Sequence, residues 1–144
     1  MTTITPGVPP GYHTVNAYLI VDDGAAALAF YARAFDGRET MRHVDDAGRV
    51  MHAEMTVGDS TIMICGENAA MNALSPKTLG GSPLHIVMYV PDVDAVFARA
   101  AAAGATPRGE VSDRPYGDRL GQVTDPFGHV WYINTRIDDA ARTA

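Results

Sequence analysis

Residues 16–35, NAYLIVDDGAAALAFYARAF, join a short apolar run to two aspartates and then to an alanine-rich segment. The apolar run is typical of a β-strand, and Asp22 and Asp23 can accept hydrogen bonds from the free N–H groups of a helix's first turn. Apolar side chains then recur at helical spacing as far as Phe35, and Gly37 is a suitable helix end. This stretch therefore predicts a strand followed directly by an aspartate-capped helix.

The same order of signals occurs again 69 residues later. A second strand-like run at residues 84–90, LHIVMYV, precedes Asp92, and an alanine-rich helical segment follows and ends at Gly104. Val21 and Val90 are 69 residues apart, and so are the two capping aspartates. Repetition at a constant spacing indicates two copies of one structural unit.

Each predicted helix is followed by strands that turns connect. Residues 51–57 alternate between apolar and polar side chains, which is the period of a strand with one buried face. Further strands are predicted at 39–43, 61–65, 120–124 and 130–135. Residues 125–128, DPFG, match a type I turn and are expected to serve only as that turn.

The sequence therefore predicts an α+β fold of two βαβββ modules within one domain, residues 12–136. Module one covers about residues 14–66, a Gly/Pro-rich linker covers 67–83, module two covers 84–135, and residues 1–11 form an N-terminal arm. Side by side, two such sheets would curve into a cup with the helices outside. The sequence leaves open whether each cup is built by one chain or by two.

Strand alternation divides the sheet residues into two sets. The set expected to face the helices is Leu19, Val21, Met55, Ile62, Ile64, Ile86, Met88, Val90, Trp131 and Ile133. The set expected to face the cup is Asn16, Tyr18, His52, Glu54, Met63, His85, Tyr89, Tyr132 and Asn134. The second set combines aromatic side chains with a few polar groups, which is the composition of a small-molecule pocket.

The composition of the chain restricts its possible partners. Its 144 residues carry a net charge of −6, so nucleic acid is not expected to bind. No apolar run reaches the roughly 20 residues that span a bilayer, and the first residues lack the features of a signal peptide. A single cysteine, Cys65, excludes a disulfide within the chain. A cytoplasmic protein without a membrane partner is therefore expected.

Short segments spread over residues 12–135 carry a resemblance when they are taken together. They lie at residues 18–22, 30–31, 50–54, 89–90, 92–95, 103–105, 116–119 and 125–131. They resemble the PhnB-like branch of the vicinal oxygen chelate superfamily, which includes glyoxalases, bleomycin resistance proteins and extradiol dioxygenases. The resemblance implies paired βαβββ modules and usually a homodimer. It leaves the function open, since members include metal-dependent isomerases, lyases and dioxygenases as well as non-catalytic drug-binding proteins.

The resemblance also implies where a metal would be held. In metal-using members, four ligands come from the first and last strands of the modules, and the matching positions here are Asn16, Met63, His85 and Tyr132. Only His85 is a good ligand for a divalent ion, because Met63 is a soft thioether, Asn16 a weak donor and Tyr132 a phenol with an ordinary pKa of about 10. We therefore predict that the usual metal site is absent and that no cofactor is required.

His52 and Glu54 lie two residues apart on one predicted strand, so their side chains point the same way. Together with His85 they are candidates for acid–base catalysis, or for a displaced divalent-metal site of two imidazoles and a carboxylate. The alternative is that His52 and Glu54 hydrogen-bond across strands and hold the sheet in register.

The remaining candidates are ligand-binding residues. They are Asn16, Tyr18, Met63, Tyr89, Tyr116, Arg119, Tyr132 and Asn134. Arg119 offers a fork of donors to a carboxylate or phosphonate, and the alternative is a surface contact between Asp118 and Arg119.

Three functions follow from these residues. The first is a protein that binds an aromatic or cationic small molecule in the cup without the usual metal. The second is a lyase, isomerase or dioxygenase acting on a small oxygenated metabolite. The third is a structural or regulatory dimer whose cup is filled by side chains.

Overall fold

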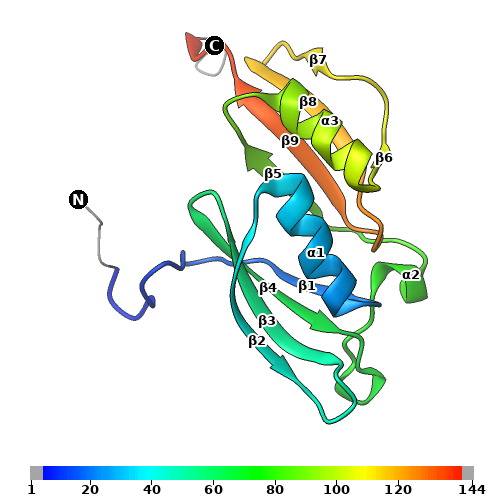
Figure 1. Ribbon diagram of the computed structural model, residues 1–144. Coiled ribbons are helices and arrows are strands. Elements are labelled where there is room, and N and C mark those ends of the chain that lie inside the picture. Colours follow the sequence, from blue (N-terminus) through cyan, green and yellow to red (C-terminus); the bar gives the residue numbers. More distant parts are fainter. Residues whose placement is uncertain (1–4, 141–144) are drawn as a thin grey trace.

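The computed structural model describes residues 5–140 and contains two modules of the same design (Figure 1). Module one comprises β1 (Tyr18–Val21), α1 (Gly24–Phe35), β2 (Arg38–Val44), β3 (Val50–Val57) and β4 (Ser60–Gly66). Module two comprises β5 (His85–Tyr89), α3 (Val93–Ala103), β6 (Thr106–Pro107), β7 (Ser112–Asp113), β8 (Asp118–Thr124) and β9 (Val130–Arg136). Between them lie a 3-10 turn, η1 (Ala69–Met71), and a short helix, α2 (Pro76–Leu79). The predicted βαβββ order is confirmed, with the second strand of module two divided into β6 and β7.

Both long helices begin where the sequence predicts. Asp23 caps α1 by accepting a hydrogen bond from the Ala26 N–H at 3.0 Å, and Asp92 caps α3 by accepting one from the Ala95 N–H at 3.1 Å. The first residues of α1 and α3 are 69 positions apart, which is the spacing of the sequence repeat. The repeat is therefore structural.

The end of α1 differs from the prediction in its chemistry. Asp36, and not Gly37, has the left-handed backbone conformation that ends the helix, with φ 54°. Aspartate is one of the few residues besides glycine that tolerate this conformation. Gly37 instead gives Met55 room to pack, because a Cβ atom at position 37 would lie 2.7 Å from Cε of Met55.

The strands form two sheets. In module one the strand order is β1-β4-β3-β2, and in module two it is β5-β9-β8-β6, with β7 also paired to β8. β1 runs parallel to β4 and β5 runs parallel to β9, while the other neighbours are antiparallel. The first strand of each module, β1 or β5, thus lies at an edge of its sheet.

One face of each sheet contributes to a core that both modules share. The predicted helix-facing residues that are buried are Leu19, Val21, Met55, Ile62, Ile64, Trp131 and Ile133. Those on or beside the edge strand β5 are partly buried against the same core: Ile86, Met88 and Val90. The prediction of which strand residues face the helices is therefore confirmed.

The two sheets do not form one cup within a single chain. α1 covers β3 and β4, α3 covers β8 and β9, and the two helices contact each other where the modules meet (Figure 1). Within residues 5–140, no hydrogen-bonded ladder joins the two sheets. We call the face of each sheet that its helix leaves uncovered its cup face, and each chain has two separate cup faces.

None of the helices in residues 5–140 has the length and apolar character that crossing a lipid bilayer requires. Residues 1–4 of the predicted arm lie outside the described residues.

Candidate ligand-binding site

The cup face of module one contains a row of side chains that crosses all four strands. Tyr18 on β1 pairs with Met63 on β4, Met63 pairs with Glu54 on β3, and Glu54 pairs with Met41 on β2. Because directly paired residues project from the same face of a sheet, these side chains lie next to one another. The structure thus brings Tyr18, Glu54 and Met63 together, as alternation predicted.

His52 joins this row through hydrogen bonds. The Tyr18 hydroxyl lies 2.8 Å from Nδ1 of His52, and Nε2 of His52 lies 2.8 Å from Oε2 of Glu54. Since a carboxylate only accepts, Nε2 carries a proton and donates to Glu54, and Nδ1 of a neutral imidazole accepts from Tyr18. The Tyr18 and His52 rings also stack, with centroids 5.5 Å apart. We call this chain of three groups the Tyr18–His52–Glu54 relay.

The outer end of the relay is open and its inner end is buried. Glu54 is 7% exposed, whereas Tyr18 is 45% exposed. Partial burial and the neighbouring Cys65 raise the pKa of the Tyr18 hydroxyl above its ordinary value, so it holds its proton at neutral pH. Burial also raises the pKa of the Cys65 thiol, so that sulfur is not an activated nucleophile.

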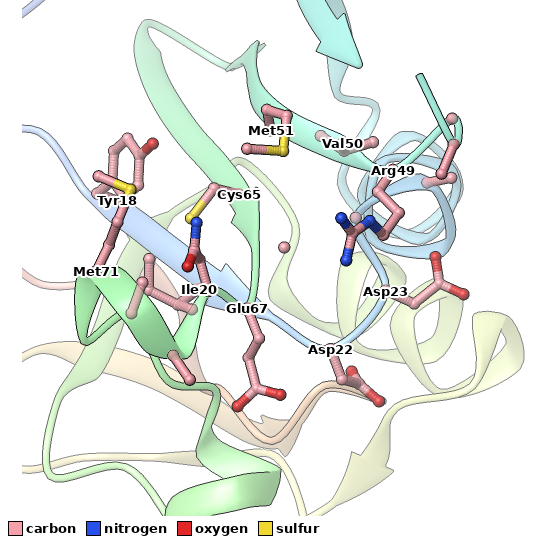
Figure 2. Close-up of a pocket in the computed structure, with 18 residues that line it drawn as sticks. Tyr18, Ile20, Asp22, Asp23, Arg49, Val50, Met51, Cys65, Glu67 and Met71 are labelled. Atoms are coloured by element: carbon pink, nitrogen blue, oxygen red, sulfur yellow. The ribbon is translucent and has the colours of Figure 1, made fainter. Parts of the chain in front are cut away.

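A cavity of about 740 Å³ adjoins Tyr18 on this cup face (Figure 2). Its walls come from β1, the start of α1, the turn between β2 and β3, the start of β3, the end of β4 and the linker around η1. Met51 reaches it because of a bulge in β3: His43 pairs with His52 and Val44 with Val50, so Met51 has no partner. The bulge sends Val50 into the core and leaves Met51 exposed.

The cup face of module two contains a second polar pair. Nδ1 of His85 on β5 lies 3.1 Å from the hydroxyl of Tyr132 on β9, and their rings are 5.1 Å apart. Val87, which pairs with Tyr132, is 55% exposed on the same face. An apolar edge beside a histidine–tyrosine pair is therefore open to solvent in a single chain.

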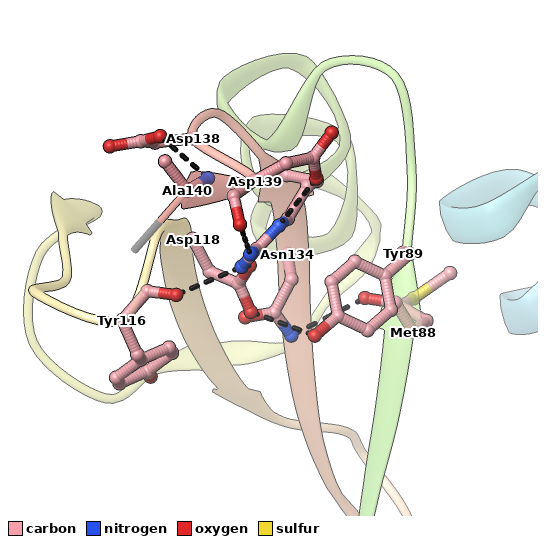
Figure 3. Close-up of polar contacts among 9 residues, drawn as sticks. Met88, Tyr89, Tyr116, Asp118, Asn134, Asp138, Asp139 and Ala140 are labelled. Carbon is pink, nitrogen blue, oxygen red and sulfur yellow. Dashed lines mark hydrogen bonds and ion pairs between the residues drawn. The ribbon is translucent and has the colours of Figure 1, made fainter. Parts of the chain in front are cut away.

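Tyr89 and Asn134 belong to a partly buried polar network beside that pair (Figure 3). The Tyr89 hydroxyl donates to Oδ2 of Asp118 at 2.7 Å, and Arg136 donates to Oδ1 of Asp118 at 2.9 Å. Asn134, which is 3% exposed, donates to the carbonyls of Met88 and Tyr132. These contacts satisfy buried polar groups and hold β5, β8 and β9 together.

Two candidates lie outside the relay and the His85–Tyr132 pair. Arg119 faces α3, and its guanidinium binds Asp94 at 2.8 Å and Asp113 at 2.9 Å. The predicted alternative, a contact with Asp118, does not form either, because Asp118 lies on the opposite face of β8 and binds Arg136. Tyr116 lies in the loop before β8, where its carbonyl accepts from Arg136.

The four positions implied for a metal do not fit a divalent ion. Both amide atoms of Asn16 bind the backbone of His13, and Nδ1 of His85 is engaged with Tyr132. Met63 offers only a thioether. Nor do His52, Glu54 and His85 gather, since in the part of the chain described here no three His, Cys, Asp or Glu side chains lie close enough to hold a metal ion.

Sequence reasoning missed several residues of this site. His43 and Met41 share the cup face because of the register of β2 against β3. Met51 and Met71 reach the cavity through a bulge and through the linker. The alternation at residues 51–57 hid the bulge, and no short-range signal gives a cross-strand register.

The comparison with known families agrees with this architecture. A family model described as Glyoxalase/Bleomycin resistance protein/Dioxygenase superfamily matches residues 12–133. The chain belongs to this superfamily. The resemblance inferred from the sequence is therefore confirmed.

Curated relatives and solved structures are similar to the chain over most of its length. Uncharacterized proteins of Mycobacterium bovis and Mycobacterium tuberculosis are 41% identical over 126 residues, which are 85% of this chain and 83% and 74% of the two relatives. TioX from Micromonospora sp. ML1 is 25% identical with a TM-score of 0.67, covering 88% of this chain and 98% of TioX.

Two further superfamily structures share the fold at lower identity. A PhnB protein from Bacillus cereus is 18% identical with a TM-score of 0.63, covering 85% of this chain and 99% of that protein. The fosfomycin resistance protein FosX from Listeria monocytogenes, in complex with Mn(II) and sulfate, is 17% identical with a TM-score of 0.69, covering 90% of this chain and 94% of FosX. At these identities the likeness establishes the fold alone.

Proposed function

We propose that this protein binds a small organic molecule in a cup that two copies of the chain form together. In this arrangement the cup face of module one in one copy lies opposite the cup face of module two in the other. The observation that carries the proposal is the open state of both faces: the Tyr18–His52–Glu54 relay and the His85–Tyr132 pair are each exposed at one end.

The edges of the sheets support the pairing of two copies. β1 and β5 are edge strands, and large apolar side chains on or beside β5 are exposed, namely Leu84, Val87 and Tyr89. Exposed edges of this kind are normally covered in proteins, since unpaired backbone groups and apolar surface favour association. A second copy would cover both features and would bring two sets of polar groups to one ligand.

The donor set favours binding without the usual metal. Aromatic rings and a few hydrogen-bonding groups are what small-molecule pockets commonly contain. While the Tyr18 proton is donated to His52, the Tyr18 oxygen can still accept a hydrogen bond from a ligand, and the Tyr132 oxygen can accept another. These groups suit a ligand with an aromatic or apolar body and at least one hydrogen-bond donor.

Calorimetric titration against a panel of aromatic and cationic compounds, combined with mass spectrometry of co-purifying molecules, tests this function. Tyr18→Phe removes a hydroxyl and keeps the ring, so affinity should fall about tenfold, which corresponds to roughly 1.4 kcal/mol. Tyr116→Phe, which lies outside the relay and the His85–Tyr132 pair, should bind like the wild type. Failure of every compound to bind, with nothing co-purifying, would contradict the proposal.

The relay itself favours a second candidate function, acid–base catalysis. Tyr18 can pass its proton to Nδ1 of neutral His52 while the Tyr18 oxygen takes a proton from a carbon of the ligand, which leaves the ligand as its enolate and the imidazole protonated. Glu54 orients the imidazole and stabilises its charge. Exchange of a ligand C–H for deuterium in heavy water, followed by NMR, would detect proton abstraction. Equal exchange in His52→Ala would exclude this role.

A further inference from the structure

The module-one cavity has two chemically different ends (Figure 2). One end is lined by the Tyr18 ring and by the sulfur-containing side chains of Met51, Cys65 and Met71, with Ile20 beside them. At the other end lie carboxylates and one guanidinium, from Asp22, Asp23, Glu67 and Arg49. A ligand filling both ends would therefore be amphipathic.

The sulfur-lined end is apolar, exposed and held in place. Met51 is 46% exposed and Met71 is 76% exposed, so both thioethers meet solvent although they line a cavity. The bridge between Asn68 and Ala73 fixes the shape of the linker, and the hydrogen bond from the Glu67 N–H to the Val21 carbonyl joins its start to β1. Thioethers adapt to different shapes and make favourable contacts with aromatic rings. This end suits a flat aromatic body.

The charged end keeps a negative excess. A side-chain hydrogen bond from Thr78 and a backbone hydrogen bond from Ser75 lower the pKa of Glu67, so this carboxylate stays ionised at neutral pH. Asp22 lies 3.5 Å from Lys77, a contact between two exposed groups that water screens. Arg49 is not a free counter-charge.

Arg49 and Asp23 are each engaged with another group of the chain. Nε of Arg49 already binds Asp45 at 2.8 Å. The Asp23 side chain caps α1 by accepting from the Ala26 N–H at 3.0 Å. Asp22 and Glu67 are therefore the carboxylates that can meet a ligand's positive charge.

We infer that this cavity binds an organic cation with a flat aromatic body, the ring system lying against Tyr18, Met51 and Met71 and the positive group lying toward Asp22 and Glu67. The inference rests on the proposed small-molecule function and names its ligand class. Neutral ligands of the same shape lack the electrostatic attraction to these carboxylates, and anionic ligands are repelled by them.

A matched pair of dyes tests the inference with the full-length protein. At mildly alkaline pH 9-aminoacridine is a cation and acridine is neutral, while both have the same three-ring body. Fluorescence titration should give an affinity about tenfold higher for 9-aminoacridine. Asp22→Asn should reduce the difference in affinity between the two dyes. Added salt should lower the affinity for 9-aminoacridine and leave that for acridine unchanged.

Variants of the sulfur-lined end supply the second arm. Met51→Ala and Met71→Ala should each lower the affinity for both dyes several-fold, since in the proposed complex both thioethers contact the ring system. Leu79→Ala, which removes an exposed apolar side chain outside the cavity, is the matched control and should bind like the wild type. Thermal melting of each variant verifies that it is folded.

Equal affinity for the two dyes, or unchanged binding in both methionine variants, would overturn the inference. If Tyr18→Phe still weakened a ligand of the calorimetric panel in that case, the cup-face site would stand and only the ligand class would be wrong. Absence of binding by both dyes and by the whole panel would contradict the inference and the proposed function together.

Discussion

At the scale of single residues, Asp125 does more than its turn requires. The hydrogen bond from the Gly128 N–H to the Asp125 carbonyl confirms the predicted turn. The buried side chain also accepts from two backbone N–H groups, from the Trp131 indole at 2.9 Å and from the Tyr31 hydroxyl at 2.5 Å. Because Tyr31 belongs to α1, this carboxylate ties module two to module one. The expectation of a turn alone is corrected, since a spacing rule cannot show which distant donors approach a carboxylate.

Tyr31→Phe should lower the free energy of unfolding by about 1.5–3 kcal/mol, because it removes a hydrogen bond to a buried charged acceptor. Burial and Asp125 raise the pKa of Tyr31 well above 10, so the folded state keeps this proton where an unfolded tyrosine loses it. The contribution is therefore complete below about pH 10 and decreases as the pH rises further. Urea unfolding at about pH 8 and about pH 11 checks this: the gap between wild type and variant should shrink at the higher pH. A constant gap would contradict it.

At the scale of elements, local signals predicted the long helices and main strands and failed elsewhere. The aspartate caps and the alternation at residues 51–57 correspond to α1, α3 and β3. β6 and β7 were missed because each has two residues and exists only through pairing with β8. Residues 67–83 were predicted only as a Gly/Pro-rich linker, and they contain η1 and α2. The position of α2 depends on Gly128 in the turn at residues 125–128. A Cβ atom on Gly128 would lie 2.7 Å from Cβ of Pro76, so α2 packs closely against this turn.

The cap of α3 offers a test at this scale. Asp92→Ala should destabilise the protein by about 1 kcal/mol, because the Ala95 N–H loses its acceptor. Asp92→Asn should recover most of that loss, since asparagine caps about as well as aspartate. Midpoints of urea denaturation for the three proteins decide the matter. An asparagine variant as unstable as the alanine variant would show that charge, and not the cap, is responsible.

At the scale of the whole molecule, packing of the helices separates the two cup faces of a chain. α1 and α3 meet between the modules and share one core with both sheets. The relay and the His85–Tyr132 pair consequently belong to different faces. A complete cup then needs a second copy, as proposed above.

Mixed dimers test this arrangement directly. His52→Ala and His85→Ala chains, co-expressed with different tags, form a heterodimer in which one proposed cup keeps both histidines and the other has neither. The heterodimer should bind ligand at one site with wild-type affinity, while each homodimer binds weakly. Calorimetric stoichiometry measures this. No recovery in the heterodimer would mean that each cup belongs to a single chain.

The sequence by itself determined the two-module repeat, the starts of the helices and the residues that face the core, because capping, turns and alternation act over a few neighbouring residues. Only the tertiary structure decided the rest. The relay depends on the register between β1, β4 and β3, the cavity depends on the bulge at Met51, and the separation of the cup faces depends on contact between α1 and α3. These features join residues distant in sequence, and packing of the whole chain sets their positions.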